Sequence, residues 1–206
     1  MIFQAYGGKY TPELKSPAVE MPYEGDYTQE VYAQQLIDEY IEMGVDPDDV
    51  WPQSFNMEDV IYWVKNTDYG EQAVFLDGNY AATPDEYNAF MEKAVSEGIN
   101  IIAPPMWRLI KVDTDAELNM SSSDYTMAAK AHGLDIITWT LERTGPSASG
   151  MDGWYWQNLE DLPAKTEGSR YEILYTLAYD VEILGIFSDW PATVTFFANC
   201  MDLLVR

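Results

Sequence analysis

The sequence predicts an α/β fold in which helices cover a sheet of parallel strands. Two observations carry this prediction: short β-rich runs alternate with segments of helical periodicity, and the helical segments are bounded by capping residues. Alternating strands and helices favour parallel pairing, because a parallel connection needs a crossover. The 206 residues, 47% of them hydrophobic, are enough for one sizeable core. We therefore predict a single domain over residues 1–206.

The predicted strands are short and apolar, with room for a helix between most of them. They are Asp49–Phe55, Gln72–Asp77, Ile99–Ala103, Leu134–Leu141 and Val181–Ser188. The predicted helices are Thr28–Met43, Asn56–Val64, Thr83–Glu97, Ser123–His132, Arg170–Tyr179 and Ala192–Leu204. The first helix begins at Thr28, a candidate N-cap, and ends before Gly44. The third has Pro84 at its first helical position and ends before Gly98.

The segment Tyr10–Pro17 (YTPELKSP) is a further candidate strand near the start of the chain. Glu13 and Lys15 are two residues apart, so in a strand they point to the same face. Pro12 is unexpected there, because it cannot donate a ladder hydrogen bond in a central strand. With this segment there are about six βα units. A closed (β/α)8 barrel needs eight and an open sheet can stop at six, and the spacing alone does not decide between them.

The strongest compositional fact is a net charge of −24. A surface this acidic repels phosphate backbones, so we expect no nucleic-acid partner. Most of the acidic side chains are scattered over helix surfaces and favour solubility; the alternative is that some gather divalent cations. Cys200 is the only cysteine, which excludes a disulfide framework within the chain. No apolar run is long enough for a transmembrane segment.

The least regular stretches are Met106–Ser122 and Arg143–Ser169, which follow predicted strands. Functional loops of α/β barrels follow strands, so we expect both stretches to contribute to a site. The aromatic run Trp154–Trp156 either covers a pocket or packs onto the rim of the barrel.

Five phrases of the sequence together resemble the glycerophosphodiester phosphodiesterase family. They are TPELKSP, VWPQSFN, AHGLDIITWTLER, DGWYWQ and GIFSDWPATVTFFANC. The resemblance runs from about Gly8 to Asp202 and is specific because the phrases occur in the family's order. It implies a TIM barrel of the (β/α)8 type, represented here by strands three to eight with their helices. The family's N-terminal His-Arg, Glu-x-Asp and second His motifs do not occur, which implies an N-terminally truncated, incomplete barrel.

The resemblance implies that Glu13 is one of the family's metal-binding carboxylates and that Lys15 contacts the phosphate. The residue types suit these roles, because hard cations prefer carboxylate oxygen and an ammonium group acts as a point charge beside a phosphate. The expected cofactor is a divalent cation, Ca²⁺ or Mg²⁺. The alternative is a solvent-exposed acid–base pair of little energetic value.

Three further residues are expected to bind substrate. The resemblance places Trp139 on the pocket wall, although a tryptophan in a barrel strand more often packs in the core. Glu142 follows at the loop end, where it either orients water or substrate or is simply solvated. Gln53 either hydrogen-bonds substrate or fixes its loop.

Acid–base catalysis in this family is assigned to two histidines, a residue type that titrates near neutrality. This sequence has one histidine, His132, at a predicted helix end before Gly133. A histidine there bonds the last carbonyls of the helix, so we interpret His132 as structural. We therefore assign no catalytic residue and expect the chain as given to be inactive.

The function implied is metal-dependent hydrolysis of a small-molecule glycerophosphodiester, in lipid metabolism, to glycerol 3-phosphate and an alcohol. Two alternatives stay open: a carbohydrate-active barrel that uses Glu13 and Glu142 as paired carboxylates, and a non-catalytic relic kept for binding. Open strand edges of an incomplete barrel predict self-association. The acidic surface is compatible with a periplasmic or extracellular location, where relatives with a signal peptide act.

Overall fold

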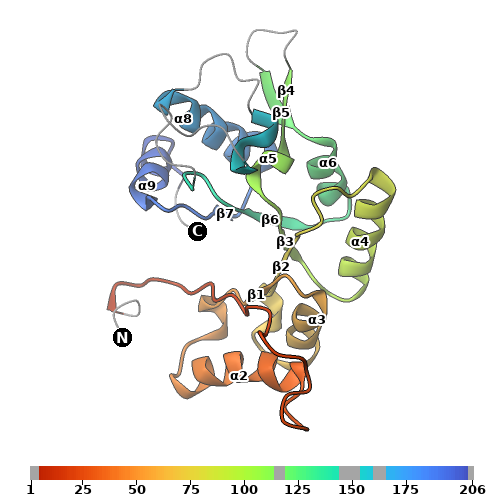
Figure 1. Ribbon diagram of the computed structural model, residues 1–206. Helices are drawn as coiled ribbons and strands as arrows, with labels where there is room; N and C mark the ends of the chain where they lie inside the picture. Colours follow the sequence, from red (N-terminus) through yellow and green to blue (C-terminus); the bar gives the residue numbers. More distant parts are fainter. Residues whose placement is uncertain (1–4, 114–118, 144–153, 160–165, 204–206) are drawn as a thin grey trace. The chain divides into compact units, whose positions relative to one another are not determined.

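The computed structural model describes residues 5–113, 119–143, 154–159 and 166–203, which belong to two compact units (Figure 1). Unit 1 comprises Met1–Asn79 and Ala89–Ile102, and unit 2 comprises Tyr80–Asn88 and Ala103–Arg206. The division into two compact units does not test whether residues 1–206 form one domain, so the single domain stays a prediction. Within the described ranges, no helix combines the length and the apolar character that crossing a membrane requires.

Unit 1 contains three adjacent strands in the order β1-β2-β3 and the helices that flank them. The strands are β1 (Gln53–Ser54), β2 (Val74–Leu76) and β3 (Ile101–Ala103), the last residue of which belongs to unit 2. The helices are α2 (Gln29–Glu42), α3 (Met57–Asn66), the second part of α4 (Pro84–Ser96) and the short 3-10 helices η1 (Pro47–Asp49) and η2 (Gly70–Gln72). Strands β1 and β2 are parallel, with Gln53 opposite Val74 and Ser54 opposite Phe75.

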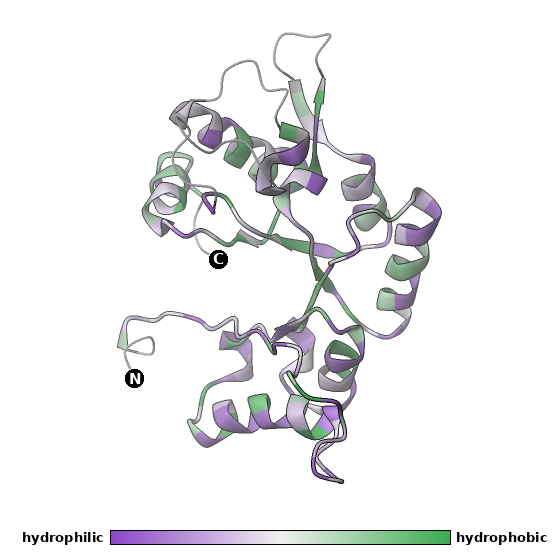
Figure 2. Cartoon of the chain, viewed as in Figure 1, coloured by the Kyte–Doolittle hydropathy of each residue, from purple (hydrophilic) through white to green (hydrophobic). Residues whose placement is uncertain are grey.

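The core of unit 1 lies between its strands and the helices α2 and α3. Its buried members are Leu14, Ala33, Ile37, Val45, Val50, Val60, Ile61, Trp63, Tyr69, Ala73, Ala94 and Ile99. Helices α2 and α3 show purple and green residues along their length, as expected for amphipathic helices with one apolar side (Figure 2). Trp63 joins the two helices, because its indole Nε1 donates to the Ala33 carbonyl at 2.9 Å.

The segment Tyr10–Pro17 runs parallel to residues 49–53, which lead into β1, and four backbone hydrogen bonds join the two. They run from Tyr10 N to Asp49 O (2.8 Å), Trp51 N to Tyr10 O (2.8 Å), Gln53 N to Pro12 O (2.9 Å) and Leu14 N to Gln53 O (2.9 Å). A continuous parallel ladder would need one more bond, from the nitrogen of residue 12 to the Trp51 carbonyl, and proline has no N–H. The expected strand is therefore two isolated parallel bridges, Tyr10 with Val50 and Glu13 with Gln53.

Unit 2 contains the parallel strands β6 (Asp135–Thr138) and β7 (Gly185–Ile186). The register places Ile137 opposite Gly185 and Thr138 opposite Ile186. Its longer helices are α6 (Asp124–Ala131), α8 (Glu167–Thr176), which continues into the π-helix η4 (Leu177–Val181), and α9 (Pro191–Cys200). The 3-10 helix η3 spans Trp154–Leu159. Beyond the end of β6, an isolated parallel bridge joins Trp139 to Pro105.

Strands lie within all five predicted segments, although each observed strand has only two to four residues. Helices occupy all six predicted positions, so the α/β class with parallel pairs is confirmed. The prediction that Met106–Ser122 is irregular is wrong. This stretch contains the short helix α5 (Met106–Leu109) and the antiparallel pair β4 (Ile110–Asp113) and β5 (Asn119–Ser122). The pairing of the two strands stabilises segments whose own periodicity is too short to be recognised.

Candidate functional site

Glu13, Lys15 and Gln53 lie on one face of the strand layer in unit 1. Glu13 and Gln53 are direct partners in a parallel bridge, so their side chains project to the same side. Leu14, between Glu13 and Lys15, projects to the opposite side and is buried in the core with α2 and α3 residues. Glu13, Lys15 and Gln53 therefore face away from the core that α2 and α3 cover.

Glu13 and Lys15 form an accessible ion pair. The Lys15 Nζ lies 2.8 Å from Glu13 Oε1, and the side chains are 75% and 23% exposed for Lys15 and Glu13 respectively. Ion pairs this open to water contribute about 0–1 kcal/mol to stability. Because so little is lost when the pair separates, both charges can be redirected to a ligand.

Gln53 differs from this pair in being buried. Its backbone is fixed by the hydrogen bonds to Pro12 and Leu14. Among the residues that the structure describes, its side-chain Oε1 has no hydrogen-bond partner. A buried acceptor without a partner costs stability and calls for an explanation such as a bound ligand or ion.

The sequence resemblance implies a divalent cation beside Glu13, so the oxygen ligands on this face are relevant. No group of three or more His, Cys, Asp or Glu side chains that could hold a metal occurs in the described ranges. The face does bring together a carboxylate, Glu13, and an amide oxygen without a partner, Gln53 Oε1. Both are hard oxygen ligands, and Mg²⁺ is commonly bound by one or two carboxylates with water and phosphate oxygens completing its shell. By residue type, Glu13 and Gln53 could therefore supply at most two protein ligands to a cation.

Glu142, at the end of the β6 segment in unit 2, is buried rather than solvated. Its Oε2 accepts a hydrogen bond from Ser188 Oγ at 2.6 Å and a longer one from the Trp190 backbone N–H at 3.5 Å. Its Oε1 has no partner among the described residues. The alternative of a solvated loop carboxylate is therefore wrong. Ser188 was missed from the sequence, because nothing in its own neighbourhood links it to Glu142.

Trp139 is half-buried and belongs to a cluster of five aromatic rings, here called the aromatic cluster. Its indole Nε1 donates to the Ala103 carbonyl at 2.8 Å. The members of the aromatic cluster are Tyr80, Trp107, Trp139, Trp154 and Tyr155. The sequence indicated Trp139, Trp154 and Tyr155 but missed Tyr80 and Trp107, which come from other segments. Trp156 does not share this environment and is fully buried.

His132 is the C-cap residue of α6, so its assignment to a helix end is confirmed. Its backbone N–H bonds the Ala128 carbonyl, and its ring Nε2 lies 3.2 Å from Asn88 Oδ1. These contacts agree with a structural role.

Asp59, in the first turn of α3, is a buried carboxylate that sequence reasoning missed. It accepts hydrogen bonds from Gln29 Nε2 (2.8 Å), Ser54 Oγ (2.8 Å) and Asn56 Nδ2 (3.1 Å). Burial raises the pKa of Asp59 above its ordinary value, and the three hydrogen bonds oppose that rise. The buried position of Asp59 and its donors from other segments are tertiary features without a local signal.

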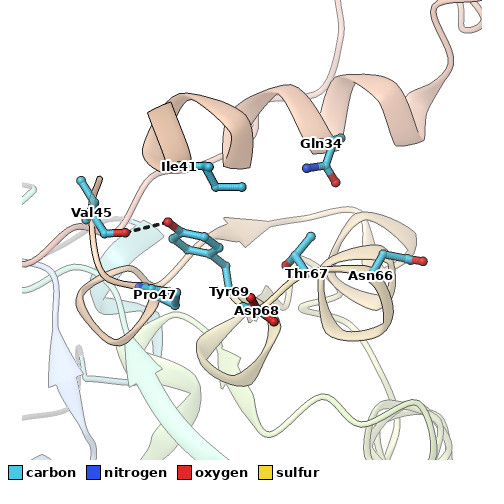
Figure 3. A pocket seen from close by; sticks show the side chains of 8 residues that line it. All are labelled: Gln34, Ile41, Val45, Pro47, Asn66, Thr67, Asp68 and Tyr69. Carbon is cyan, nitrogen blue, oxygen red and sulfur yellow. Dashed lines mark hydrogen bonds between the residues drawn. The ribbon is translucent and has the colours of Figure 1, made fainter. Parts of the chain in front are cut away.

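A surface cavity of about 410 Å³ lies in unit 1 between α2 and the chain that follows α3 (Figure 3). It is lined by Gln34, Ile41, Val45, Pro47, Asn66, Thr67, Asp68 and Tyr69. The Tyr69 hydroxyl donates to the Val45 carbonyl at 2.7 Å, and burial raises the pKa of Tyr69. None of the residues predicted to bind metal or substrate lines this cavity.

Comparison with protein families finds no family model that matches the chain. A curated protein of Arthroderma benhamiae, named "Extracellular protein", is 43% identical over 210 residues, which cover 98% of this chain and 83% of that protein. This identity over nearly the whole chain shows common family membership.

Three solved structures of proteins named as glycerophosphoryl diester or glycerophosphodiester phosphodiesterases share the fold at 14–16% sequence identity. They come from Agrobacterium tumefaciens (TM-score 0.55), Silicibacter pomeroyi (0.59) and Galdieria sulphuraria (0.54). The match covers 94%, 96% and 93% of this chain, but only 59%, 52% and 57% of those chains. The chain thus spans little more than half the length of these structures.

The likeness confirms the fold that the five sequence phrases implied. The chain belongs to the family of the Arthroderma benhamiae extracellular protein, and its fold is that of the glycerophosphodiester phosphodiesterases.

Proposed function

We propose that the face formed by Glu13, Lys15 and Gln53 binds the phosphate of a glycerophosphodiester together with a divalent cation, Mg²⁺ or Ca²⁺. The observation that carries the proposal is the position of these three residues on the side of the strands that faces away from the α2–α3 core. Gln53 lies in β1, which ends at the next residue, and sites of (β/α)8 folds lie at the carboxyl-terminal ends of the strands.

Each residue has a separate task in this proposal. Glu13 and the Gln53 amide oxygen supply two ligands to the cation, and Lys15 places its ammonium beside the phosphate oxygens. A bound cation would withdraw charge from the phosphoryl oxygens and so favour attack at phosphorus. Without a ligand, Lys15 neutralises Glu13 across 2.8 Å, and that exposed pair separates at small cost.

The reaction proposed for the family fold is hydrolysis of the phosphodiester to glycerol 3-phosphate and an alcohol. Proton transfer in that reaction suits two histidines, and the only histidine in these 206 residues caps α6 and contacts Asn88. We therefore propose that the chain binds the phosphodiester but does not turn it over unaided. We also propose an extracellular location, supported by the name of the Arthroderma benhamiae relative.

Titration of the chain with glycerol 3-phosphate in a calorimeter, with and without Mg²⁺ or Ca²⁺, tests the proposal. Binding should require the cation and disappear with a chelator. Glu13→Gln should weaken it by at least about tenfold, because a metal ligand is lost. Lys15→Met should weaken phosphate binding while leaving cation binding in place.

Glu20→Gln is the matched control, since Glu20 is an exposed carboxylate on the same segment of chain. It should bind as the unaltered protein does. Equal affinity in the Glu13→Gln and Glu20→Gln variants, or binding that ignores a chelator, would contradict the proposed site. Release of glycerol 3-phosphate from glycerophosphocholine by the purified chain, if blocked by a chelator, would contradict the assignment of no catalytic residue.

A further inference from the structure

The cavity of unit 1 lies apart from the Glu13 face (Figure 3). Val45 and Pro47 belong to the chain that leads into β1, and residues 67–69 belong to the chain that leads into β2. Both segments approach the amino-terminal ends of their strands, whereas a substrate site of this fold lies at the carboxyl-terminal ends. The cavity volume of about 410 Å³ is within the range of small-molecule pockets, so there is room for a ligand of its own.

One part of the cavity lining is apolar. Val45 and Tyr69 are buried and joined to each other, since the Tyr69 hydroxyl donates to the Val45 carbonyl at 2.7 Å. Ile41 reaches the cavity from α2 and is exposed, and Pro47 completes the apolar part. Methylene groups of a ligand would be removed from water against these side chains.

The polar part of the lining presents hydrogen-bond acceptors. The Thr67 hydroxyl donates to the Trp63 carbonyl at 2.9 Å, and Asn66 Nδ2 donates to the Tyr62 carbonyl at 2.8 Å, so each directs a donor into α3. Asp68 is exposed, and no group in the described part of the chain donates to its carboxylate. The Asp68 carboxylate and the Asn66 Oδ1 are therefore available to a ligand that donates hydrogen bonds.

The charge around the cavity is negative. None of its eight lining residues is a lysine or an arginine. Burial raises the pKa of Tyr69, and the carboxylates of Asp46 and Asp68 raise it further, so both charges reach the cavity wall. Lys65, in the last turn of α3, is paired with Glu97 instead. This field repels an anion and attracts a cation.

The lining favours an organic cation over a metal ion. Asp68 is the one carboxylate among the lining residues, and the described ranges contain no group of three or more His, Cys, Asp or Glu side chains that could hold a metal. A metal ion would gain nothing from the apolar part of the lining. An ammonium group on an aliphatic chain uses both parts, because it has three donors and its chain is apolar.

We infer that this cavity binds a primary alkylammonium ion. The ammonium group would donate hydrogen bonds to the Asp68 carboxylate and to Asn66 Oδ1. The alkyl chain would lie against Ile41, Val45 and Tyr69. Free aliphatic amines and lysine side chains both carry this group, and the experiment has a probe for each.

The test is a titration of the isotope-labelled chain with butylamine, followed by the amide signals in two-dimensional NMR spectra. Butanol is the matched ligand, because it has the same chain with a neutral hydroxyl. Butylamine should shift the signals of Val45 and residues 67–69 in a saturable way and bind about fivefold more tightly than butanol. Added salt should weaken binding of the amine only. Equal affinity of the two ligands, or no saturable shift at the cavity, would overturn the inference.

A lysine with its main-chain amino and carboxyl groups blocked distinguishes the two sources of the ammonium group. Tighter binding of the blocked lysine than of butylamine would assign the cavity to a lysine side chain of a peptide. Tighter binding of butylamine would assign it to a free amine. Either result supports an ammonium site, and binding of neither compound would contradict it.

Asp68→Asn should weaken butylamine binding by about fivefold and leave butanol binding unchanged, because it removes the charge and keeps the shape. Asp26→Asn is the matched control, since Asp26 is an exposed aspartate of the same unit that does not line the cavity. It removes the same unit of charge and should bind butylamine as the unaltered protein does. Equal affinity in the two variants would contradict the inference, and the NMR spectra show directly that both are folded.

Glu13→Gln separates this inference from the proposed function. It should weaken cation-dependent binding of glycerol 3-phosphate and leave butylamine binding unchanged, whereas Asp68→Asn should do the reverse. Loss of butylamine binding in Glu13→Gln would contradict a separate site. Failure of the unaltered chain to bind glycerol 3-phosphate, with butylamine binding intact, would overturn only the proposed function.

Discussion

Two glutamates that the sequence assigns to one site, Glu13 as a metal ligand and Glu142 as a substrate contact, lie in opposite environments. Glu13, in unit 1, is partly exposed and its partner is the largely exposed Lys15. Glu142, in unit 2, is buried and held by Ser188 and the Trp190 backbone. The first can exchange its partner for a ligand at little cost, whereas the second has one oxygen committed to the fold. Whether a glutamate is available to a ligand therefore depends on the free-energy cost of separating it from its present partner, and the sequence does not reveal that cost.

The side chains discussed in the two units also differ in kind. The Glu13 face of unit 1 carries an ion pair and a buried amide oxygen, while the aromatic cluster of unit 2 consists of rings packed against one another. The variants below alter one unit at a time and use the other as reference.

The largest effects should come from one fully buried tryptophan in each unit. Trp63→Ala in unit 1 and Trp156→Ala in unit 2 each remove a fully buried ring, and each should lower the free energy of unfolding by about 3–5 kcal/mol. Denaturant titration should show a lower midpoint in both variants. An unchanged midpoint in either variant would contradict the buried position of its ring.

Substitution of Gly70 should give the next largest loss of stability. A Cβ at Gly70 would lie 2.4 Å from the Trp63 carbonyl oxygen and from the Val64 Cα, both of them backbone atoms that cannot rotate away. Gly70→Ala should therefore destabilise the protein by about 3 kcal/mol, measured by denaturant titration. Gly185→Ala in unit 2 is the control, since no atom lies within 4 Å of its added Cβ. Equal stability of the two variants would show that the chain near Gly70 is free to shift.

The partners of the two glutamates can be compared directly. Ser188→Ala should cost about 2 kcal/mol, because it removes the short hydrogen bond to a buried carboxylate. Lys15→Met should cost less than about 1 kcal/mol, because it removes an exposed ion pair. Thermal unfolding of the two variants measures the difference. A larger loss of stability in Lys15→Met than in Ser188→Ala would contradict the view that Glu142 is held more strongly than Glu13.

Asp59 adds a smaller effect that depends on pH. Burial raises its pKa in the folded state, so the folded protein binds the proton more tightly than the unfolded chain does. The stability contribution of Asp59 is then largest at low pH and falls as pH rises from the ordinary value of 3.8 through the raised one. Asp59→Asn removes that fall, so the stability of the variant relative to the unaltered protein should increase over this pH range.

Glu97 serves as the comparison for Asp59, because its pKa is shifted in the opposite direction. Its hydrogen bond and ion pair with Lys65 lower its pKa, so its contribution is present above the ordinary pKa and is lost as pH falls. Glu97→Gln should therefore matter at neutral pH and not in acid. Parallel pH profiles for the Asp59 and Glu97 variants would contradict both assignments.

Local patterns were sufficient to predict most of the helices and strands and the shared face of Glu13 and Lys15. Capping residues and periodicity located α2, α3 and α4, and the period of two placed Glu13 and Lys15 together. The unusual Pro12 was visible as well, although only the hydrogen bonds on either side of it show that the ladder is interrupted there.

Features that depend on distant residues could not be predicted from local patterns. Ser188 reaches Glu142 across 46 residues, and the Asp59 site includes Gln29 from 30 residues away. Tyr80 and Trp107 join Trp154 only in the folded chain. The pairing of β4 with β5 was missed for the same reason, since each strand gains its stability from the other.

Direct measurement of cation affinity tests the central claim, that Glu13 is the glutamate available to a ligand. Mn²⁺ binding, followed by electron paramagnetic resonance as a stand-in for Mg²⁺, would be compared in the unaltered chain and in Glu13→Gln and Glu142→Gln. We predict that Glu13→Gln weakens Mn²⁺ binding by at least about tenfold and that Glu142→Gln leaves it unchanged. Loss of binding in Glu142→Gln with full binding in Glu13→Gln would contradict the account.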